Sequence, residues 1–440
     1  MHVLIIGGGT GGMCLAHGLK KAGVSVAVYE RHRTRRDGLF GYRVGIDPTG
    51  SRSLHECLPP QLFDTFVATC AKDPQHLNVW TQSMHTTASF RLPDAKDHVN
   101  AERSVSRSTL RQVLFTGMDD VVHYGREFTG YDQLPDGKVR ADFADGSSAT
   151  GDLLVAADGS RSKVRRQFLP HATVKDTGIT ALATRTALTS QVRALIPDEA
   201  LNGMSLIFGT KGMIGMLHSM QFKWDADGNP KDPGDKALLD SWSGLQFDNT
   251  RDYLNLSVWS THARFPAGVT EQRGQELIGT VLDSTRNWHP DLRRIFELSD
   301  PAAAFPLKIA TSEPVEPWKS TNITLLGDAI HTMTPGQGVG ANTALRDAAL
   351  LCRHLTAAAR GRQSLPAAVA AYEAEMIPYG FQRVADSLGQ NGTTAADPLY
   401  KPGIGRLALF GARSYFSVMS KVPALRTHFL DQMYAYRGDE

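Results

Sequence analysis

Cysteine is scarce in this sequence. Its four cysteines, Cys14, Cys57, Cys70 and Cys352, are far apart, and none belongs to a Cys-x-x-Cys pair. This spacing excludes a zinc module, a dithiol redox centre and a disulfide-stapled scaffold, and it favours buried, reduced thiols. No other group of side chains has metal-ligand spacing, and no Gly-x-Ser-x-Gly segment is present, so we expect neither a metal site nor a serine hydrolase.

Long apolar runs and an excess of one charge are also missing. No stretch reaches the roughly 18 consecutive apolar residues of a membrane span, and glycines follow the first apolar residues too soon for a secretory leader. The formal net charge is +2, with both signs mixed along the chain. We therefore expect a cytoplasmic protein without a nucleic-acid or membrane partner. The apolar stretch 407–418 is interrupted by Arg413, which favours a docked amphipathic helix over a membrane anchor.

What is present is enough apolar material for a large core. With 440 residues, 41% of them apolar, the chain exceeds the usual size of one domain, and we expect two joined lobes. A strand at 2–6, a helix at 11–22 and a second strand at 25–29 form the order of a parallel βαβ unit. Short apolar segments at 153–156 and 322–326 end in small or acidic turn residues, as buried parallel strands do. The expected fold class is α/β.

The middle of the chain has a different hydrophobic pattern. Strand-like alternation prevails between 177 and 317, where helical patterns also occur, and helices are expected after 339. Within 214–224 one parity is much more apolar than the other, and its members are Ile214, Met216, His218, Met220, Phe222 and Trp224. This face is either the core of an antiparallel sheet or the wall of a pocket. In the second case Met216, His218, Met220 and Phe222 would contact a large apolar substrate.

The first sign of chemistry is a glycine pattern. Gly7-x-Gly9-x-x-Gly12 lies between the first strand and the first helix. Gly7 permits a tight turn, Gly9 lets the backbone approach a pyrophosphate, and Gly12 lets the helix pack on the strand. The second strand ends at Glu30, an acid placed to accept hydrogen bonds from the ribose hydroxyls of an adenosine. The pattern predicts a dinucleotide site, but it does not choose between FAD and NAD.

Two further segments make that choice. Ala157-Asp158-Gly159-Ser160 follows the apolar segment at 153–156, and Leu326-Gly327-Asp328 leads into the glycine-rich stretch 335–342. An acid at a strand end can bind a ribitol hydroxyl, and glycines before a helix can bring backbone amides against a flavin ring. These features indicate FAD.

In this order and at these distances, the three segments resemble those of the para-hydroxybenzoate hydroxylase-like FAD-dependent monooxygenases. Weaker matches are Tyr42-Arg43-Val44-Gly45-Ile46-x-Pro48 and Ser106-Arg107-x-x-Leu110-Arg111. The resemblance implies a Rossmann-like FAD/NAD(P)-binding fold of the glutathione reductase type with an inserted antiparallel-sheet domain. The implied boundaries are 1–71, 98–176 and 318–440 for an FAD-binding domain with C-terminal helices, and 72–97 and 177–317 for a substrate-binding domain.

The resemblance also implies site residues. The FAD-binding set is Gly7, Gly9, Thr10, Gly12, Glu30, Arg31, Arg43, Arg107, Asp158, Asp328, Gly338, Gly340, Ala341 and Asn342. The candidate catalytic residues are Pro335, beside the flavin face where oxygen reacts, and Arg43, on a loop that meets the mobile flavin. A purely structural role stays open for Asp158 and Arg165, and His331 is favoured as a structural hydrogen-bonding residue over a catalytic base.

The activity implied by the resemblance is oxygen insertion. NAD(P)H would reduce FAD, oxygen would form a flavin C4a-hydroperoxide, and one oxygen atom would pass to a fairly large apolar aromatic or polyketide-like substrate in secondary metabolism. Few acid or base side chains are needed, because the cofactor performs the chemistry. The alternatives are a flavin-dependent oxidoreductase or dehydrogenase without oxygen insertion and a catalytically idle flavin-binding regulator. The expected partners are the small-molecule substrate and O2, and the expected assembly is a monomer or homodimer.

Overall fold

The structure is a computed structural model. It describes residues 1–35, 37, 43–93, 97–225, 227–242, 245, 251–390 and 392–436. Tyr42, part of the weaker match at 42–48, lies outside these residues.

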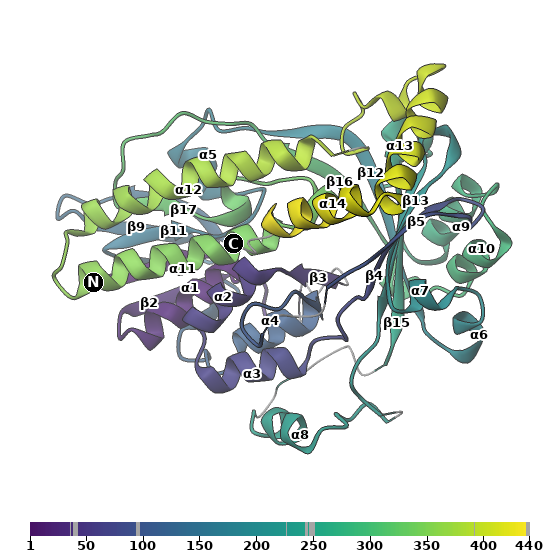
Figure 1. Cartoon of the computed structure of the whole chain (residues 1–440). Coiled ribbons are helices and arrows are strands. Elements are labelled where there is room, and N and C mark those ends of the chain that lie inside the picture. The colour runs from purple at the N-terminus through teal and green to yellow at the C-terminus, as the bar shows by residue number, and fades with distance from the viewer. Residues whose placement is uncertain are drawn as a thin grey trace.

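The first lobe is built on a five-stranded parallel sheet (Figure 1). Its strands are β1 (His2–Ile6), β2 (Ser25–Glu30), β7 (Val122–Tyr124), β11 (Leu153–Ala156) and β17 (Ile323–Leu325), in the order β17-β11-β1-β2-β7. Ile6 pairs with Ala156, which pairs with Leu325. Because the strands are parallel, the turns after β1, β11 and β17 meet at one edge of the sheet. The predicted α/β class is confirmed.

Helices pack tightly against one face of this sheet. Around it lie α1 (Thr10–Lys21), α2 (Pro48–Cys57), α3 (Pro60–Ala68), α4 (Arg107–Phe115), α5 (Lys163–Phe168), α11 (Gly340–Ala359) and α12 (Leu365–Leu388). A Cβ at Gly18 would lie 2.6 Å from Cys352 Sγ and 3.1 Å from Cys57 Sγ. Glycine therefore lets α1 approach α11 and α2, and it brings together thiols that are distant in sequence. All four cysteines are buried and free.

A small antiparallel sheet completes the first core. It consists of β8 (Phe128–Gln133), β9 (Val139–Phe143) and β10 (Ser148–Gly151), and its buried side chains Val139, Ala141 and Phe143 join the same hydrophobic cluster as β1 and α1. A separate antiparallel pair, β3 (Arg43–Ile46) and β6 (Arg103–Ser106), lies between the first lobe and the second.

The second lobe is built on a seven-stranded sheet in the order β16-β12-β15-β14-β13-β4-β5. The strands are β4 (His76–Thr81), β5 (Thr86–Arg91), β12 (Val174–Ala187), β13 (Gly203–Phe208), β14 (Ile214–Met220), β15 (Tyr253–Thr261) and β16 (Phe305–Ser312). Neighbouring strands are antiparallel, except that β13 and β4 run parallel. The expected antiparallel sheet is therefore present with one parallel pair.

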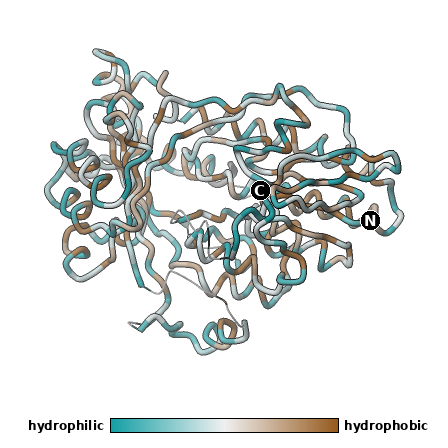
Figure 2. Tube along the Cα trace, turned by 180° about the vertical axis from the view of Figure 1, so that it is seen from behind, coloured by the Kyte–Doolittle hydropathy of each residue, from teal (hydrophilic) through white to brown (hydrophobic). Residues whose placement is uncertain are grey.

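The two faces of the second sheet have different coverings. One face packs Leu182, Leu217 and Leu256 into a core with α9 (Gly274–Ser284) and α10 (Pro290–Glu297). The short helices α6 (Ser190–Arg193) and α7 (Asp198–Leu201) lie on the same side (Figure 1). At one end of the other face, Phe208 and Ile214 pack under α13 (Ile404–Lys421), which α14 (Pro423–Tyr436) follows. Figure 2 shows hydrophobic residues along the strands of both lobes.

One strand boundary differs from the expectation. The alternation at 214–224 continues past the strand, which ends at Met220. Phe222 and Trp224 make only isolated bridges, to Ala71 and Pro230. Their rings instead join Met220, Tyr253 and α8 (Pro233–Asp240) in a small buried cluster. The predicted domain boundaries remain predictions. No helix in the described ranges has both the length and the apolarity to cross a bilayer.

Candidate active site

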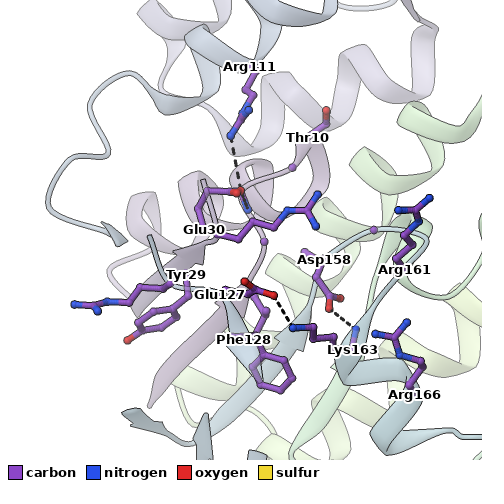
Figure 3. A pocket seen from close by; sticks show the side chains of 18 of the residues that line it. Thr10, Tyr29, Glu30, Arg111, Glu127, Phe128, Asp158, Arg161, Lys163 and Arg166 are labelled. Carbon is purple, nitrogen blue, oxygen red and sulfur yellow. Dashed lines mark hydrogen bonds and ion pairs between the residues drawn. The ribbon is translucent and has the colours of Figure 1, made fainter. Parts of the chain in front are cut away.

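A cavity of about 420 Å³ opens at the carboxyl edge of β1, β2 and β11. Figure 3 shows its side chains, with Tyr29, Glu30 and Arg111 on one side and Asp158, Arg161 and Arg166 on the other. Of the predicted cofactor-binding residues, those in its lining are Gly7, Gly9, Thr10, Glu30, Arg31, Arg107 and Asp158. Arg43, Asp328, Pro335 and the segment 338–342 lie outside this lining.

The glycine turn at residues 7–12 forms part of the cavity lining through Gly7, Gly8 and Gly9. Gly7 has φ +106°, and a Cβ there would lie 2.4 Å from Ala157 O. A Cβ at Gly12 would lie 2.4 Å from Gly7 O, so both positions exclude a side chain because the backbone is in the way. At Gly9 the nearest atom would be 3.7 Å away. No side chain caps α1, and the free amides of its first turn suit an anion.

Glu30 is held rigidly at the end of β2. Its carboxylate is buried and accepts hydrogen bonds from Gly8 N at 2.8 Å and from His32 N at 2.9 Å. Arg111 approaches the same carboxylate at 3.8 Å. With one amide on each oxygen, the carboxylate keeps acceptor capacity for hydroxyl groups in the cavity.

Cations outnumber acids around the cavity. The basic lining residues are Arg31, Arg107, Arg111, Arg126, Arg161, Lys163 and Arg166, and the acidic ones are Glu30, Glu127 and Asp158. Lys163 pairs with Glu127 at 2.7 Å. Sequence reasoning did not assign Arg126, Arg161, Lys163 or Arg166 to the site, although the last three lie in or next to the segment after β11. The positive excess suits a diphosphate.

Asp158 has one oxygen that lacks a partner. Its Oδ2 accepts the Lys163 amide at 2.9 Å, whereas its Oδ1 is buried without a hydrogen bond. Burial raises the pKa of this carboxyl, and hydrogen bonds from Ser162 and Lys163 oppose the shift. Arg165 instead ties two turns together, because it donates to Ala329 O and to Ser160 O, each at 2.9 Å. The structure gives Arg165 this structural link, one of the two readings left open by the sequence.

The turn after β17 packs at the start of α1. A Cβ at Gly11 would lie 2.7 Å from Leu326 Cδ1, so this turn and the glycine turn are neighbours. Asp328 is exposed on this turn. Although its surface is exposed, protein atoms crowd around its carboxyl group and raise its pKa, and the charges of His331 and Arg107 oppose this shift. Arg107 therefore links the cavity electrostatically to Asp328.

His331 lies behind the turn, where its Nε2 is hydrogen-bonded and its buried Nδ1 has no partner among the described residues. Its Nε2 donates to Asp347 Oδ2 at 2.6 Å, and the Gly327 amide donates to the same oxygen at 2.9 Å. Both side chains are buried. Burial alone would lower the pKa of His331, but Asp347 raises it above its usual value. This arrangement is that of a structural hydrogen-bonding residue.

The glycine-rich stretch before α11 is fastened to β3 by Asn342. The Asn342 Nδ2 donates to Gly45 O at 3.0 Å, and its Oδ1 accepts the Asp47 amide at 3.1 Å. Gly338 has a left-handed backbone conformation, with φ +69°. Both Gly338 and Pro335 are exposed. Arg43, on β3, donates from Nε to Ser104 Oγ at 2.8 Å. The structure thus brings Arg43 and the segment 335–342 together at one place.

The predicted substrate residues separate into two groups. Met216 and His218 are half-buried on β14. Met220 and Phe222 are buried in the cluster with Tyr253 and α8. Met220 and Phe222 are therefore part of a packed core, as the first alternative from the sequence expected, whereas Met216 and His218 are only partly covered. A role in substrate binding stays a prediction for all four residues.

These features fit an extended flavin dinucleotide. The α1 amides and the lining cations suit its diphosphate, Glu30 suits the adenosine ribose, and the unpartnered Asp158 Oδ1 offers a buried acceptor. The fold and the cavity define a dinucleotide-binding flavoprotein of the Rossmann type.

Comparison with known proteins narrows this class. Residues 5–39 match an NAD(P)-binding Rossmann-like domain, and residues 301–387 match an FAD binding domain. A solved structure from Photorhabdus luminescens, assigned as an FAD-containing monooxygenase, is 32% identical with a TM-score of 0.75, over 88% of this chain and 96% of that one. The chain belongs to the para-hydroxybenzoate hydroxylase-like FAD-dependent monooxygenases. The predicted family and its cofactor FAD are confirmed.

Other relatives differ in length and name. The dual O-methyltransferase/FAD-dependent monooxygenase elcB of Phaeosphaeria nodorum is 30% identical over 94% of this chain, which spans only 46% of elcB. The chain thus spans about half the length of the first curated relatives. Aurachin C monooxygenase/isomerase of Stigmatella aurantiaca is 27% identical over 89% of this chain and 90% of its own length. Klebsiella pneumoniae HpxO, solved with FAD and uric acid, shares the fold with a TM-score of 0.74 at 21% identity, over 99% of this chain and 96% of that one.

Proposed function

We propose that this protein is an NAD(P)H- and O2-dependent monooxygenase that oxygenates a fairly large apolar aromatic or polyketide-like molecule. The observation that carries the proposal is the meeting of the turns after β1, β11 and β17 at one sheet edge, with Glu30 at the end of β2 beside them. Within the first lobe, this edge is where an extended flavin dinucleotide would lie.

Each part of the FAD molecule would be held by a different group of the predicted residues. Gly9, Thr10, Glu30 and Arg31 hold the adenosine diphosphate half, and Arg107, Asp158 and Asp328 hold the centre. Gly338, Gly340 and Ala341 present backbone to the flavin ring beside Pro335 and Arg43. Bound FAD supplies hydride acceptance from NAD(P)H and the activation of O2.

The side chains of this chain serve mainly to bind, orient and keep out water. The positive end of α11 stabilises negative charge on the ring edge near Gly340. Asn342 bonds the backbone of Gly45 and Asp47 and so holds β3, which carries Arg43, against the start of α11. The cavity-facing side chains hold no isolated acid-base pair that would dominate the chemistry, which agrees with a cofactor-driven reaction.

The substrate class is inferred from the half-buried part of β14. Met216 pairs with Leu206 on β13 and with Ser257 on β15, so this face is apolar with a few polar groups. One relative is named as an aurachin C monooxygenase/isomerase and another as a urate hydroxylase. We infer that the residues 72–97 and 177–317 form the substrate-binding domain.

Reconstitution and product analysis test the function. Purified protein is expected to bind FAD, to consume NAD(P)H faster with an accepted aromatic, polyketide or quinone compound, and to place one atom of isotopically labelled O2 in the product. Protein that cannot be reconstituted with FAD would contradict the proposal. A product without the label would support the dehydrogenase alternative instead.

A substitution on β14 tests the substrate face. Met216→Ala is expected to raise KM for the substrate roughly tenfold, because about 1.4 kcal/mol of apolar contact is lost from this half-buried side chain, with FAD affinity unchanged. Met216→Leu conserves volume and should stay within about threefold of the wild type. Steady-state kinetics measure both, and an unchanged KM in Met216→Ala would remove Met216 from the substrate site.

A further inference from the structure

Exposed hydrophobic side chains concentrate on α13. Six of the eight large hydrophobic residues that are exposed in the described chain lie on or directly after this helix: Ile404, Leu407, Phe410, Tyr415, Val418 and Val422. Leu407 is 72% exposed and Phe410 is 68% exposed. Contiguous exposed apolar surface of this kind marks an interaction site.

The spacing places most of these residues on one face. Ile404, Leu407, Tyr415, Val418 and Val422, with Gly411 between them, follow steps of three and four residues, which is the repeat of one helix face. The opposite face is already covered, because Leu409, Ala412 and Phe416 pack on the second sheet. A helix that is apolar on both sides is normally covered on both sides, so the outer face lacks its covering in the isolated chain.

The stretch of sequence that contains α13 carries only positive charge. No Asp or Glu occurs between Asp397 and Asp431, whereas Lys401, Arg406, Arg413, Lys421 and Arg426 do. Arg413 points inward and donates to Gln82 and to Phe208 O. The other four are exposed, and none of them has an ion pair among the described residues. Four exposed cations therefore lie on α13, directly before it, or at the start of α14.

This charge pattern favours an anionic lipid surface over a second copy of the chain as the binding partner of the outer face of α13. A second copy packed through a two-fold axis would bring the same four cations face to face, and their repulsion would oppose the contact. A surface rich in anionic lipid headgroups would instead pair with the cations while the apolar side chains enter the acyl boundary. We propose that the outer face of α13 docks on an anionic lipid bilayer, with the helix in the plane of the interface.

The proposal revises the expectation of no membrane partner. That expectation rested on the absence of a spanning run and on the small net charge of the whole chain. Interfacial docking needs neither, because a local apolar face and a local positive charge are sufficient. The docking also does not depend on the flavin chemistry, so it can fail or hold independently of the proposed function.

Vesicle flotation of the full-length, FAD-loaded protein tests the proposal. Vesicles of phosphatidylcholine mixed with phosphatidylglycerol are expected to bind the protein at least roughly tenfold more strongly than vesicles of phosphatidylcholine alone, and high salt should remove the difference. Equal binding to both vesicles, or binding to neither, would overturn the proposal.

Matched variants locate the surface. Leu407→Ser with Phe410→Ser should lower binding at least roughly tenfold, and so should the joint change of Lys401, Arg406, Lys421 and Arg426 to Gln. Leu307→Ser is the control, because Leu307 is 48% exposed on β16, away from α13, and binding should not change. Circular dichroism and FAD content verify that each variant folds. A concentration-dependent dimer that Phe410→Ser disrupts, without vesicle binding, would identify a second copy as the occupant.

Discussion

Glu30 and the glycines of the first turn show how backbone groups can fix single residues. Both oxygens of Glu30 are held by backbone amides, from Gly8 and His32. Gly7 and Gly12 are required by close backbone contacts, whereas Gly9 has room for a side chain. The three glycines of one pattern therefore have different physical reasons, which substitution can separate.

Glu30→Gln is expected to weaken FAD binding. The change removes the charge that receives the ribose hydroxyls, and a hydrogen bond to a charged group contributes about 1.5–3 kcal/mol, or roughly 10- to 100-fold in Kd. Fluorescence titration of the apo-protein with FAD measures the effect. Glu127→Gln is the control, because Glu127 also lines the cavity but is engaged with Lys163 at the surface. Equal affinities of the two variants would contradict the assigned role of Glu30.

Gly9→Ala should separate folding from cofactor binding. A Cβ at Gly9 clears all protein atoms by 3.7 Å or more, so the apo-protein should keep the wild-type Tm. The added methyl group would occupy the space where the pyrophosphate approaches the backbone, and FAD affinity should fall at least roughly tenfold. Gly12→Ala provides the contrast, because its Cβ would strike Gly7 O and should lower the Tm of the apo-protein itself. Undiminished FAD binding by Gly9→Ala would place the pyrophosphate elsewhere.

At the scale of elements, the Asn342 side chain makes hydrogen bonds that connect α11 to β3 and to the residue that follows it. Asn342 bridges the backbone of Gly45 and Asp47 from the first turn of α11. The sequence placed Asn342 beside the flavin ring, and the structure shows that its amide is already engaged between two elements. We therefore infer that Asn342 acts by positioning Arg43 and the glycine-rich stretch.

Asn342→Ala should weaken the contact between α11 and β3. A buried amide and a partly buried carbonyl would lose their partner, and each unsatisfied buried group costs about 1–3 kcal/mol. Thermal unfolding should show a Tm several degrees lower, and NAD(P)H-dependent reduction of bound FAD should slow. Asn202→Ala is the comparison, since Asn202 is exposed and its side-chain amide donates to Asp198 O within its own helix end. An unchanged Tm in Asn342→Ala would show that β3 is held by other contacts.

Elements were predictable where local geometry carries the signal. The strands at 2–6 and 153–156 occur with the expected bounds, because glycine or acidic turns end them. The alternation at 214–224 overran its strand, because Phe222 and Trp224 alternate in sequence but are drawn into a cluster with α8. Period alone does not distinguish a paired strand from an extended connection whose rings pack elsewhere.

At the scale of the whole molecule, stability depends on a buried histidine that joins distant segments. His17 on α1 donates from Nε2 to Leu114 O at the end of α4, at 2.8 Å. Burial lowers the pKa of His17 to about 4, and the bond to Leu114 O opposes the shift. Since the folded pKa is below the unfolded one, the stability that neutral His17 provides is present above about pH 6.5 and is lost as the pH falls toward 4.

The free energy of unfolding should therefore fall by about 3 kcal/mol between pH 6.5 and pH 4 through His17 alone. Urea unfolding at a series of pH values measures this slope, and His17→Gln should reduce it. His85→Gln should leave the slope as in the wild type, because His85 is exposed. A slope that His17→Gln does not change would assign acid sensitivity to other groups.

The sequence by itself determined the flavin-binding segments and hence the family, because strand, glycine turn and helix are set by local backbone geometry that a short stretch encodes. Only the tertiary structure decided which cations line the cavity. The same holds for the hydrogen bonds by which Asn342 connects α11 to β3, and for the exposure of one apolar face of α13. Those properties follow from the pairing of strands that lie 150 or more residues apart, such as β1 with β11 and β11 with β17, and from packing between lobes. Periodicity marks an apolar face, but contacts decide whether another element covers it.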